Sequence, residues 1–354
     1  AGSDLPTLVR DHLTEAHFRA LFEPRGVVVA GVSTHPAKCG FVSLHNILAS
    51  GYEGAVWGIS RDPGEVLGVR VVADVVDLPD GELDLVFVCT PAAANPDLLR
   101  ACAKKGIRAA FIASAGYGEM GDEGQRMQDE LVALAEELDL LVAGPNGQGV
   151  VSTPAKMCAQ IVAPYPPAGT IGIASQSGNF VSSFLNYAAQ TGVGVSRAVS
   201  AGNAAAVTIP DYLDHYATDD ATTVALAYVE GVQDGRAFFD RTRAVAARKP
   251  LVLVKGGATD GGQKAAASHT GSLASDDRVF DGMCRQAGIT RAGTIESAYE
   301  AAATFATQPL PKGNRVVVLT TAGGWGVVTA AAIRRSSLEL TAQPAALRAA
   351  LDET

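Results

Sequence analysis

The sequence predicts an α/β protein built from parallel, doubly wound sheets. Short apolar runs alternate with segments of helical spacing from residue 27 to residue 306. Continuous apolar runs are typical of strands buried on both faces, and strands that alternate with helices are typical of parallel sheets. Small-residue turns follow most of the runs, so we expect these turns to gather along the carboxyl edges of the sheets, where such folds bind ligands.

Composition and charge narrow the class of protein. The chain has 354 residues, of which 47% are hydrophobic and 18% charged. This balance is typical of a well-packed globular protein with about two or three domains. The net charge of −9, with no run of Lys or Arg, argues against a nucleic-acid partner. Anionic ligands would therefore be held by glycine amides and helix N-termini.

The cysteines and the hydropathy pattern indicate a reducing compartment. The five cysteines are scattered and have no metal-ligand spacing, so we expect reduced thiols and no metal site. No signal-like segment and no apolar run of membrane length occurs in the sequence. We therefore expect a cytoplasmic protein without a membrane partner.

The first predicted domain covers residues 7–150. Strands are predicted at residues 27–33, 55–59, 83–89, 109–113 and 140–143, and helices at residues 41–50, 97–105 and 122–138. The turn after the first strand contains Gly31 but does not match GxGxxG, and the second strand is followed by Ser60 and Arg61 rather than by an acidic residue. A nicotinamide site of the Rossmann type is therefore disfavoured.

The second predicted domain covers residues 151–307 and contains an anion-binding pattern. A strand at residues 170–174 leads through Ser175, Ser177, Gly178 and Asn179 into a helix at residues 180–190. Free amides and the helix dipole at such a start favour an anion, although a plain serine N-cap would give the same pattern. Glu230 follows another apolar strand, and we expect it to reach the same sheet edge.

A glycine-rich loop at residues 256–275 follows the strand at residues 250–255 and presents one imidazole. His269 lies between Ser268 and Thr270, and Gly271 follows. Such small neighbours would leave the ring accessible as a base or as a nucleophile toward phosphorus. Taken alone, the ring is equally compatible with a loop histidine that has no role.

The last part of the chain predicts the start of a further domain. Residues 308–313 form a linker, and a strand at residues 315–321, a glycine turn at 322–326 and a helix at 327–335 follow. One such unit cannot bury its own core. We therefore expect residues 313–354 to be an incomplete domain that further chain completes.

The ordered set of short motifs resembles the nucleoside-diphosphate-forming (NDP-forming) acyl-CoA synthetases. This family includes the succinyl-CoA ligase α subunit and the ADP-forming acetyl-CoA synthetases. Each motif is weak alone, but they occur in the family's order over nearly the whole chain. The motifs are Gly31-Val-Ser33 with Lys38 and Gly40, Thr90-Pro91, Ser114-Ala-Gly116, Gly144-Pro-Asn146, Ser175-Gln-Ser-Gly178, Tyr228-Val-Glu230-Gly, Ser268-His-Thr-Gly271 and Ala322-Gly-Gly324.

The resemblance implies an N-terminal Rossmann-like CoA-binding domain followed by flavodoxin-like succinyl-CoA-ligase domains. It implies a relay in which His269 carries a phosphoryl group between a nucleotide and the acid, and CoA takes the acyl group from an acyl phosphate. Glu230 would orient the imidazole. The phosphoryl oxygens would be held by Ser175, Ser177, Gly178, Asn179 and Gly271. CoA would be lined by Gly31, Ser33, Lys38, Gly40, Thr90, Pro91, Ala115, Gly116, Tyr117 and Asn146.

The resemblance also implies partners. ATP or GTP, or the corresponding diphosphate, would bind with Mg²⁺ mainly in an ATP-grasp subunit or domain outside this sequence. A small carboxylic acid or its acyl-CoA would be the substrate, and we expect an oligomer. The family's cysteine after Gly144-Pro-Asn146 is replaced by Gly147, and the acidic residues that often follow Gly-Asn are replaced by Ala204 to Thr208. An alternative is a non-catalytic CoA-binding regulatory module, as occurs beside an acetyltransferase domain.

Overall fold

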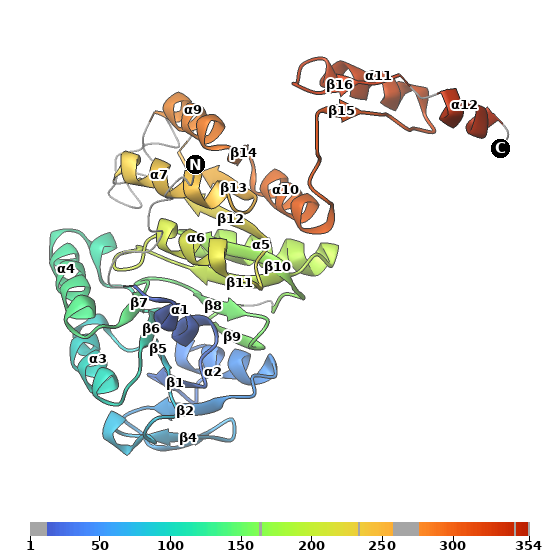
Figure 1. The fold of residues 1–354 in the computed structure, drawn as a ribbon. Coiled ribbons are helices and arrows are strands. Elements are labelled where there is room, and N and C mark those ends of the chain that lie inside the picture. The colour runs from blue at the N-terminus through green and yellow to red at the C-terminus, as the bar shows by residue number, and fades with distance from the viewer. Residues whose placement is uncertain (1–12, 163–164, 233, 258–275, 343–344, 353–354) are drawn as a thin grey trace. The chain divides into compact units, whose positions relative to one another are not determined.

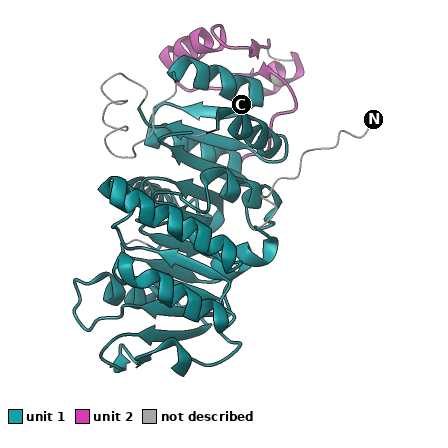
Figure 2. Cartoon of the chain, turned by 90° about the vertical axis from the view of Figure 1, so that its left-hand side faces the viewer, with its two compact units in different colours: residues 1–307 teal, residues 308–354 magenta. Residues whose placement is uncertain are grey.

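The computed structural model describes residues 13–162, 165–232, 234–257, 276–342 and 345–352. The predicted loop with His269 and Gly271 falls at residues 258–275, outside the described residues. The chain divides into two compact units, residues 1–307 and residues 308–354 (Figure 2).

The first sheet of unit 1 has seven strands in the order β3-β4-β2-β1-β5-β6-β7 (Figure 1). Its neighbouring strands are parallel except for β3, which is antiparallel to β4. The strands are β1 (Gly26–Ala30), β2 (Ala55–Ile59), β3 (Gly64–Val66), β4 (Val69–Val72), β5 (Leu85–Val88), β6 (Ala109–Ile112) and β7 (Leu141–Ala143). The helices of this part are α1 (Glu15–Phe22), α2 (Cys39–Ala49), α3 (Asn95–Lys104) and α4 (Asp122–Glu137).

The second sheet has seven strands in the order β14-β13-β12-β10-β11-β8-β9. The strands are β8 (Gly149–Ser152), β9 (Met157–Gln160), β10 (Ala168–Ser175), β11 (Val195–Ser200), β12 (Val224–Val229), β13 (Leu251–Lys255) and β14 (Thr290–Ala292). The helices are α5 (Gly178–Thr191), α6 (Ile209–Thr218), α7 (Gly235–Ala246), α9 (Asp277–Ala287) and α10 (Ile295–Thr307). Strands β10 to β14 pair in parallel, whereas β8 and β9 form an antiparallel hairpin beside β11.

Both sheets have a point where the strand order changes direction. In the first sheet β1 lies between β2 and β5, and in the second sheet β10 lies between β11 and β12. Ligands of open α/β sheets bind outside the carboxyl ends of the strands at such points. The turns after β1, β5, β10 and β12 are therefore the expected ligand positions, and each of them contains predicted site residues.

The apolar runs explain the strands. Every residue of β1, β5, β6, β7, β12 and β13 is buried, as expected for strands covered on both faces. The prediction of α/β domains with parallel sheets is confirmed, and the structure adds an antiparallel hairpin at one edge of each sheet. The hairpins β3–β4 and β8–β9 were not predicted, because their strands of three or four residues are too short to show a period.

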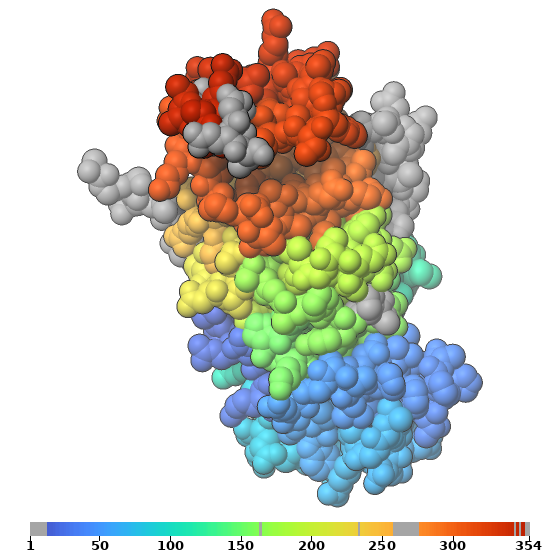
Figure 3. Space-filling model, turned by 90° about the vertical axis from the view of Figure 1, so that its right-hand side faces the viewer, coloured from blue at the N-terminus to red at the C-terminus, as the bar shows by residue number. Residues whose placement is uncertain are grey.

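One hydrophobic cluster within unit 1 is shared by the two sheets. Phe18 and Phe22 of α1 belong to the same buried cluster as Phe87 of β5 and Tyr212 of α6. Figure 3 shows the segments of the first sheet, in blue, packed against the green segments that follow residue 150. The continuous core explains why residues 1–307 form one compact unit although they contain two sheets.

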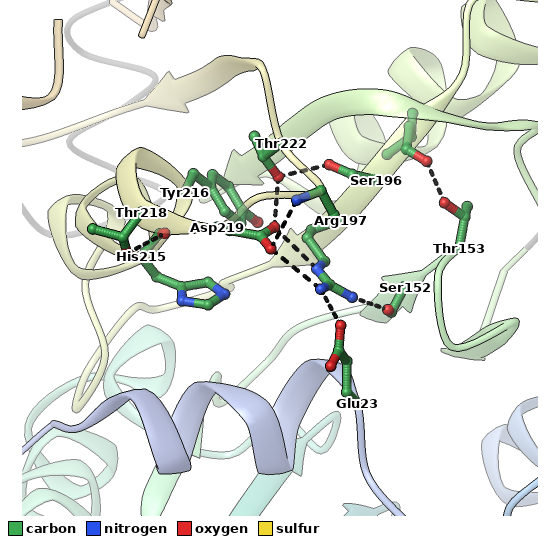
Figure 4. Close-up of polar contacts among 12 residues, drawn as sticks. Glu23, Ser152, Thr153, Ser196, Arg197, His215, Tyr216, Thr218, Asp219 and Thr222 are labelled. Atoms are coloured by element: carbon green, nitrogen blue, oxygen red, sulfur yellow. Dashed lines mark hydrogen bonds and ion pairs between the residues drawn. The ribbon is translucent and has the colours of Figure 1, made fainter. Parts of the chain in front are cut away.

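A buried arginine links α1 to the second sheet. Arg197 of β11 is 3% exposed, and its guanidinium contacts Glu23, Asp219 and Ser152 (Figure 4). It also lies 5.6 Å from the ring centre of Phe22. Burial favours the neutral acid, but hydrogen bonds from Arg197 and Thr222 outweigh it and hold the pKa of Asp219 below its usual value. The guanidinium thus neutralises carboxylates from both halves of unit 1.

A second buried ion cluster predicts how the stability of unit 1 depends on pH. Arg241 of α7 contacts Asp211 and Asp214 of α6, which are both fully buried. Burial raises the pKa of Asp214 to about 7, against the opposing effect of Arg241. The folded chain therefore binds more protons than the unfolded chain between about pH 4 and pH 7. Over this window, Asp214 lowers the free energy of unfolding as pH rises, by up to about 1.4 kcal/mol per pH unit.

Asp214→Asn should remove the decrease in unfolding free energy that Asp214 causes between about pH 4 and pH 7. Urea denaturation at pH 5 and pH 8 would measure the difference in unfolding free energy between the wild type and the variant at each pH. We expect the unfolding free energy of the variant, relative to that of the wild type, to be higher at pH 8 than at pH 5. Asp240→Asn, which changes a partly exposed carboxylate on α7, is the matched control and should leave the slope unchanged. Parallel pH profiles for the wild type and Asp214→Asn would contradict the prediction.

Unit 2 contains β15 (Arg315–Val316), α11 (Gly323–Ile333), β16 (Glu339–Leu340) and α12 (Ala345–Asp352). The predicted strand at residues 315–321 is wrong in length, because β15 ends at Val316 and pairs only with the two-residue strand β16. A strand without a sheet on either side has few partners for its backbone groups. Val317, Leu319 and Trp325 are exposed within the described part of unit 2.

Candidate functional site

The turns after β1 and β5 are in direct contact because glycines occupy the contact points. A Cβ atom on Gly31 would lie 3.0 Å from the carbonyl carbon of Cys89 and 3.2 Å from the amide nitrogen of Thr90. Its φ of +86° also favours glycine. A Cβ atom on Gly40, in the first turn of α2, would clash with the carbonyl oxygen of Gly31. The predicted residues Gly31, Gly40 and Thr90 therefore lie together at the carboxyl edge of the first sheet.

Asn95 joins this group to the turn after β6. Its side chain is fully buried, accepts a hydrogen bond from Thr90 Oγ1 at 2.8 Å, and donates to Tyr117 Oη at 2.7 Å and to Ser114 Oγ at 3.2 Å. Sequence reasoning missed Asn95. Its only signal was an Asn-Pro pair at the start of a predicted helix, which is ordinary turn chemistry.

The remaining predicted residues of this edge differ in exposure. Lys38, Pro91, Ala115 and Asn146 are exposed, whereas Ser33 and Gly116 are half-buried. Lys38 is the N-cap residue of α2, and its ammonium forms no ion pair within the described part of the chain. The Tyr117 ring is only 1% exposed and packs in the core, so it offers almost no side-chain surface to a ligand.

Glu119 holds the turn that contains Gly116 and Tyr117. Its carboxylate accepts hydrogen bonds from the amides of Gly116 at 2.6 Å and Tyr117 at 3.1 Å, and from Asn203 Nδ2 at 2.6 Å. Burial favours the neutral acid, but these hydrogen bonds outweigh it and lower the pKa of Glu119. A single carboxylate thus connects a turn of the first sheet to a residue from the second.

The loop after β11 packs directly on the Gly144–Asn146 turn of the first sheet. The amide of Asn203 donates to the carbonyl of Pro145 at 2.9 Å, and Asn146 Nδ2 donates to Asn203 Oδ1 at 3.3 Å. A Cβ atom on Gly202 would clash with the carbonyl oxygen of Pro145. The carboxyl edges of the two sheets therefore meet at Asn203, which sequence reasoning also missed.

The first turn of α5 provides free amides at the second sheet. The N-cap residue Ser177 makes no side-chain cap, and the amides of Gly178, Asn179 and Phe180 donate to no acceptor among the described residues. Ser175 has a different role, because its buried hydroxyl donates to the carbonyl of Ser177 and accepts from the Ser177 amide. Ser175 therefore shapes the turn, while the helix start keeps donors for an anion.

Glu230 lies beside this turn, as predicted from its position after a strand. It is 8% exposed, and its amide donates to Gln176 Oε1 at 2.6 Å. A Cβ atom on Gly256, which follows β13, would lie 3.5 Å from Glu230 Cγ. Burial, with a smaller contribution from the Glu230 carboxylate, raises the pKa of Tyr228 well above its usual value. The segment that leads toward residue 258 thus begins against Glu230 and Tyr228.

The described residues contain neither a metal-binding cluster nor a membrane-spanning helix. No cluster of three or more His, Cys, Asp or Glu side chains has a geometry that could hold a metal ion. Within the same residues, no helix combines the length and the apolar character needed to cross a bilayer.

Two family models match unit 1. Residues 25–153 match a CoA binding domain, and residues 168–305 match the succinyl-CoA ligase like flavodoxin domain. The first match covers the edge built around Gly31, Thr90 and Asn95. The second covers the α5 turn and Glu230.

Several proteins with named activities are similar to the chain. It is 36% identical to the alpha subunit of acetate–CoA ligase [ADP-forming] I of Pyrococcus furiosus, over 91% of this chain and 70% of the relative. It is 29% identical to 4-hydroxybutyrate–CoA ligase [ADP-forming] of Nitrosopumilus maritimus, over 94% of this chain and 48% of that longer relative.

A solved structure of a protein with a related name is similar to the chain over most of its length. The dinucleotide-forming acetyl-coenzyme A synthetase 1 of Ca. Korarchaeum cryptofilum, in complex with phosphate and ADP, superposes with a TM-score of 0.90 at 31% identity. The match covers 96% of this chain and 73% of that chain. The named relatives are ligases that form carbon–sulfur bonds, and a regulatory module is not favoured. The chain therefore belongs to the NDP-forming acyl-CoA synthetase family and is a component of an acid–thiol ligase.

Proposed function

We propose that this ligase component transfers a phosphoryl group through His269 between a nucleotide and a carboxylic acid. The neutral imidazole would attack phosphorus and later give the phosphoryl group to the acid carboxylate, which becomes an acyl phosphate. The CoA thiol would then attack the acyl carbon, forming the thioester and releasing inorganic phosphate. The reverse sequence would phosphorylate a nucleoside diphosphate.

The observation that carries this proposal is the group of Glu230, the first turn of α5 and Gly256 at the switch point of the second sheet. The free amides and the dipole of α5 suit a phosphoryl group, and the carboxylate of Glu230 suits an imidazole that must keep one tautomer. Gly256 opens the segment that contains His269 and Gly271 and lies against Glu230. We assign phosphoryl binding to Ser177, Gly178, Asn179 and Gly271, with Ser175 shaping the turn.

We further propose that CoA lies along the carboxyl edge of the first sheet. The lack of a side chain at Gly31 and Gly40 lets the turns after β1 and β5 and the start of α2 pack backbone to backbone. An edge lined by such backbone suits the close approach of a phosphate-bearing ligand. Lys38 would meet a phosphate. Gly31, Ser33, Gly40, Thr90, Pro91, Ala115, Gly116 and Asn146 would line the ligand, and Tyr117 would contribute its backbone. The division at about residue 150 into a CoA domain and a ligase-like domain follows from the same assignment.

The nucleotide, with Mg²⁺, would bind mainly to an ATP-grasp subunit or domain outside this sequence, and the complete assembly would be an oligomer. Two relatives from Pyrococcus furiosus carry the name subunit alpha, which supports a division between chains. Acetate and 4-hydroxybutyrate, which the names of relatives give as their acids, are the first probes for the acyl group.

The test is thioester synthesis by this chain combined with its ATP-grasp partner. ATP, Mg²⁺, CoA and either acetate or 4-hydroxybutyrate would be supplied, and the acyl-CoA product would be measured by chromatography. We expect a thioester that requires both proteins. CoA binding without thioester formation from short-chain acids or their homologues would contradict the proposal and favour a sensing module.

Asn203→Ala should weaken CoA binding, because the variant removes the hydrogen bonds of the Asn203 side chain with Glu119 and Asn146. We expect the dissociation constant for CoA to rise about tenfold, which corresponds to about 1.4 kcal/mol. Isothermal titration of the full chain with CoA would measure the change. Asn186→Ala, at an exposed position of α5, is the matched control. Unchanged CoA affinity in Asn203→Ala would show that the two edges do not depend on this contact.

A further inference from the structure

Gln148 lies between the edge of the first sheet to which we assign CoA and the first turn of α5 to which we assign the phosphoryl group. It follows the Gly144–Gly147 turn at the edge of the first sheet and immediately precedes β8. Its amide donates to Ser200 Oγ at 2.9 Å, and its carbonyl accepts from the amide of Ile161 at 2.8 Å. The backbone of Gln148 is thus held by β11 on one side and by the residue after β9 on the other.

The side chain of Gln148 lies on the first turns of α5. Its Oε1 accepts a hydrogen bond from Ser182 Oγ at 3.0 Å, and its Nε2 donates to Asn179 Oδ1 at 3.3 Å. A Cβ atom on Gly178 would clash with Cγ and Cδ of Gln148. A larger residue at position 178 would therefore displace the Gln148 side chain from the start of α5.

The chemistry of the side chain suits this position. A carboxamide carries no charge, so it neither repels a phosphoryl group nor competes with it for the amides of α5. One N–H of Nε2 remains without an acceptor among the described residues. Gln148 is half-buried, so part of the amide stays accessible to a ligand.

We propose that Gln148 is the positioning residue that sets the distance between the phosphoryl site at α5 and the CoA edge. The inference rests on the proposed function, in which an acyl phosphate must meet the CoA thiol between these two sites. The side chain fixes Asn179 and Gly178 relative to the Gly144–Gly147 turn, so its loss would misplace the acyl phosphate relative to the thiol. Its loss leaves the backbone amides of α5 in place, so we expect the arrival of the phosphoryl group from the nucleotide to be affected less than its transfer to the acid and CoA.

The test separates these steps in the complete assembly. Phosphorylation of the chain by ATP would be measured first, and discharge of the phosphorylated chain by acetate and CoA would follow in a single turnover. For Gln148→Leu we expect phosphorylation to be slowed far less than discharge, which should be about 100-fold slower, the cost of misplacing reacting groups by about 1 Å. For Gln148→Glu we expect both steps to be slower, because its carboxylate would lie beside the phosphoryl group. Gln190→Leu, at an exposed position of the same helix, is the matched control.

A double-mutant cycle checks the physical cause. Gly178→Ala should slow discharge in the wild-type background, because the added methyl group displaces Gln148. In a Gln148→Ala background the same methyl group has space, so the two effects should not add. Wild-type discharge by a folded Gln148→Leu variant, or additive effects in the cycle, would overturn the inference alone. A wild-type chain that never carries a phosphoryl group would overturn the proposed function and this inference with it.

Discussion

Arg197→Met should lower the free energy of unfolding of unit 1 by about 3–5 kcal/mol, the cost of removing one partner from a buried ion pair. The side chain of Arg197 is 4% exposed and that of Asp219 is 9% exposed, so water replaces little of the lost interaction. Methionine fills a similar volume but leaves Asp219 and Ser152 without the guanidinium (Figure 4). Urea denaturation would measure the change.

The matched control for this substitution is Arg236→Met. Arg236 forms an ion pair with Asp240 one turn along α7, but its side chain is 83% exposed. Exposed pairs of this kind contribute about 0.3–0.5 kcal/mol. If the two variants lost similar stability, the contacts of Arg197 with Glu23 and Asp219 would not stabilise the packing of α1 on the second sheet.

His269→Ala should lower the rate of thioester synthesis by on the order of 10⁴- to 10⁶-fold, as expected when a covalent nucleophile is lost. Glu230→Gln should cost about 100-fold, because the amide keeps the size of the side chain but no longer stabilises the imidazolium or fixes its tautomer. Initial rates with the ATP-grasp partner at saturating substrates would measure both.

Measuring CoA binding distinguishes a variant that has lost phosphoryl transfer from one that has lost its fold. Both variants should bind CoA with wild-type affinity, since the edge to which we assign CoA belongs to the first sheet. His45→Ala, which changes an exposed histidine of α2, should retain full activity. Thioester synthesis by His269→Ala at more than a few per cent of the wild-type rate would rule out the histidine as an obligatory carrier.

The sequence was sufficient to predict the two sheets and the strands whose carboxyl ends form their edges. The runs that form β1, β5 and β12 are apolar throughout, so they indicated buried parallel strands without further information. The position of Glu230 directly after β12 was enough to place it at the edge of the second sheet, and its contact with Gln176 agrees.

Contacts between distant segments could not be predicted in this way. Asn95, Glu119, Gln148 and Asn203 are single polar residues in turns or helix starts, and nothing in their local sequence distinguishes them from solvated residues. Their partners come from other segments of the folded chain. Asn95 is bound by other turns of the first sheet, and Glu119 is bound by Asn203, 84 positions away. Helix α6 did have a local signal, since Thr208 and Asp211 form a capping box.

Mass spectrometry under alkaline conditions, which preserve phosphohistidine, tests the central claim most directly. The chain would be incubated with its ATP-grasp partner, ATP and Mg²⁺, and its peptides analysed with and without later addition of acetate and CoA. We predict one added phosphoryl group on His269 that disappears when acid and CoA are added, and that forms more slowly in Glu230→Gln. An unmodified His269 in an assembly that still synthesises the thioester would contradict the relay.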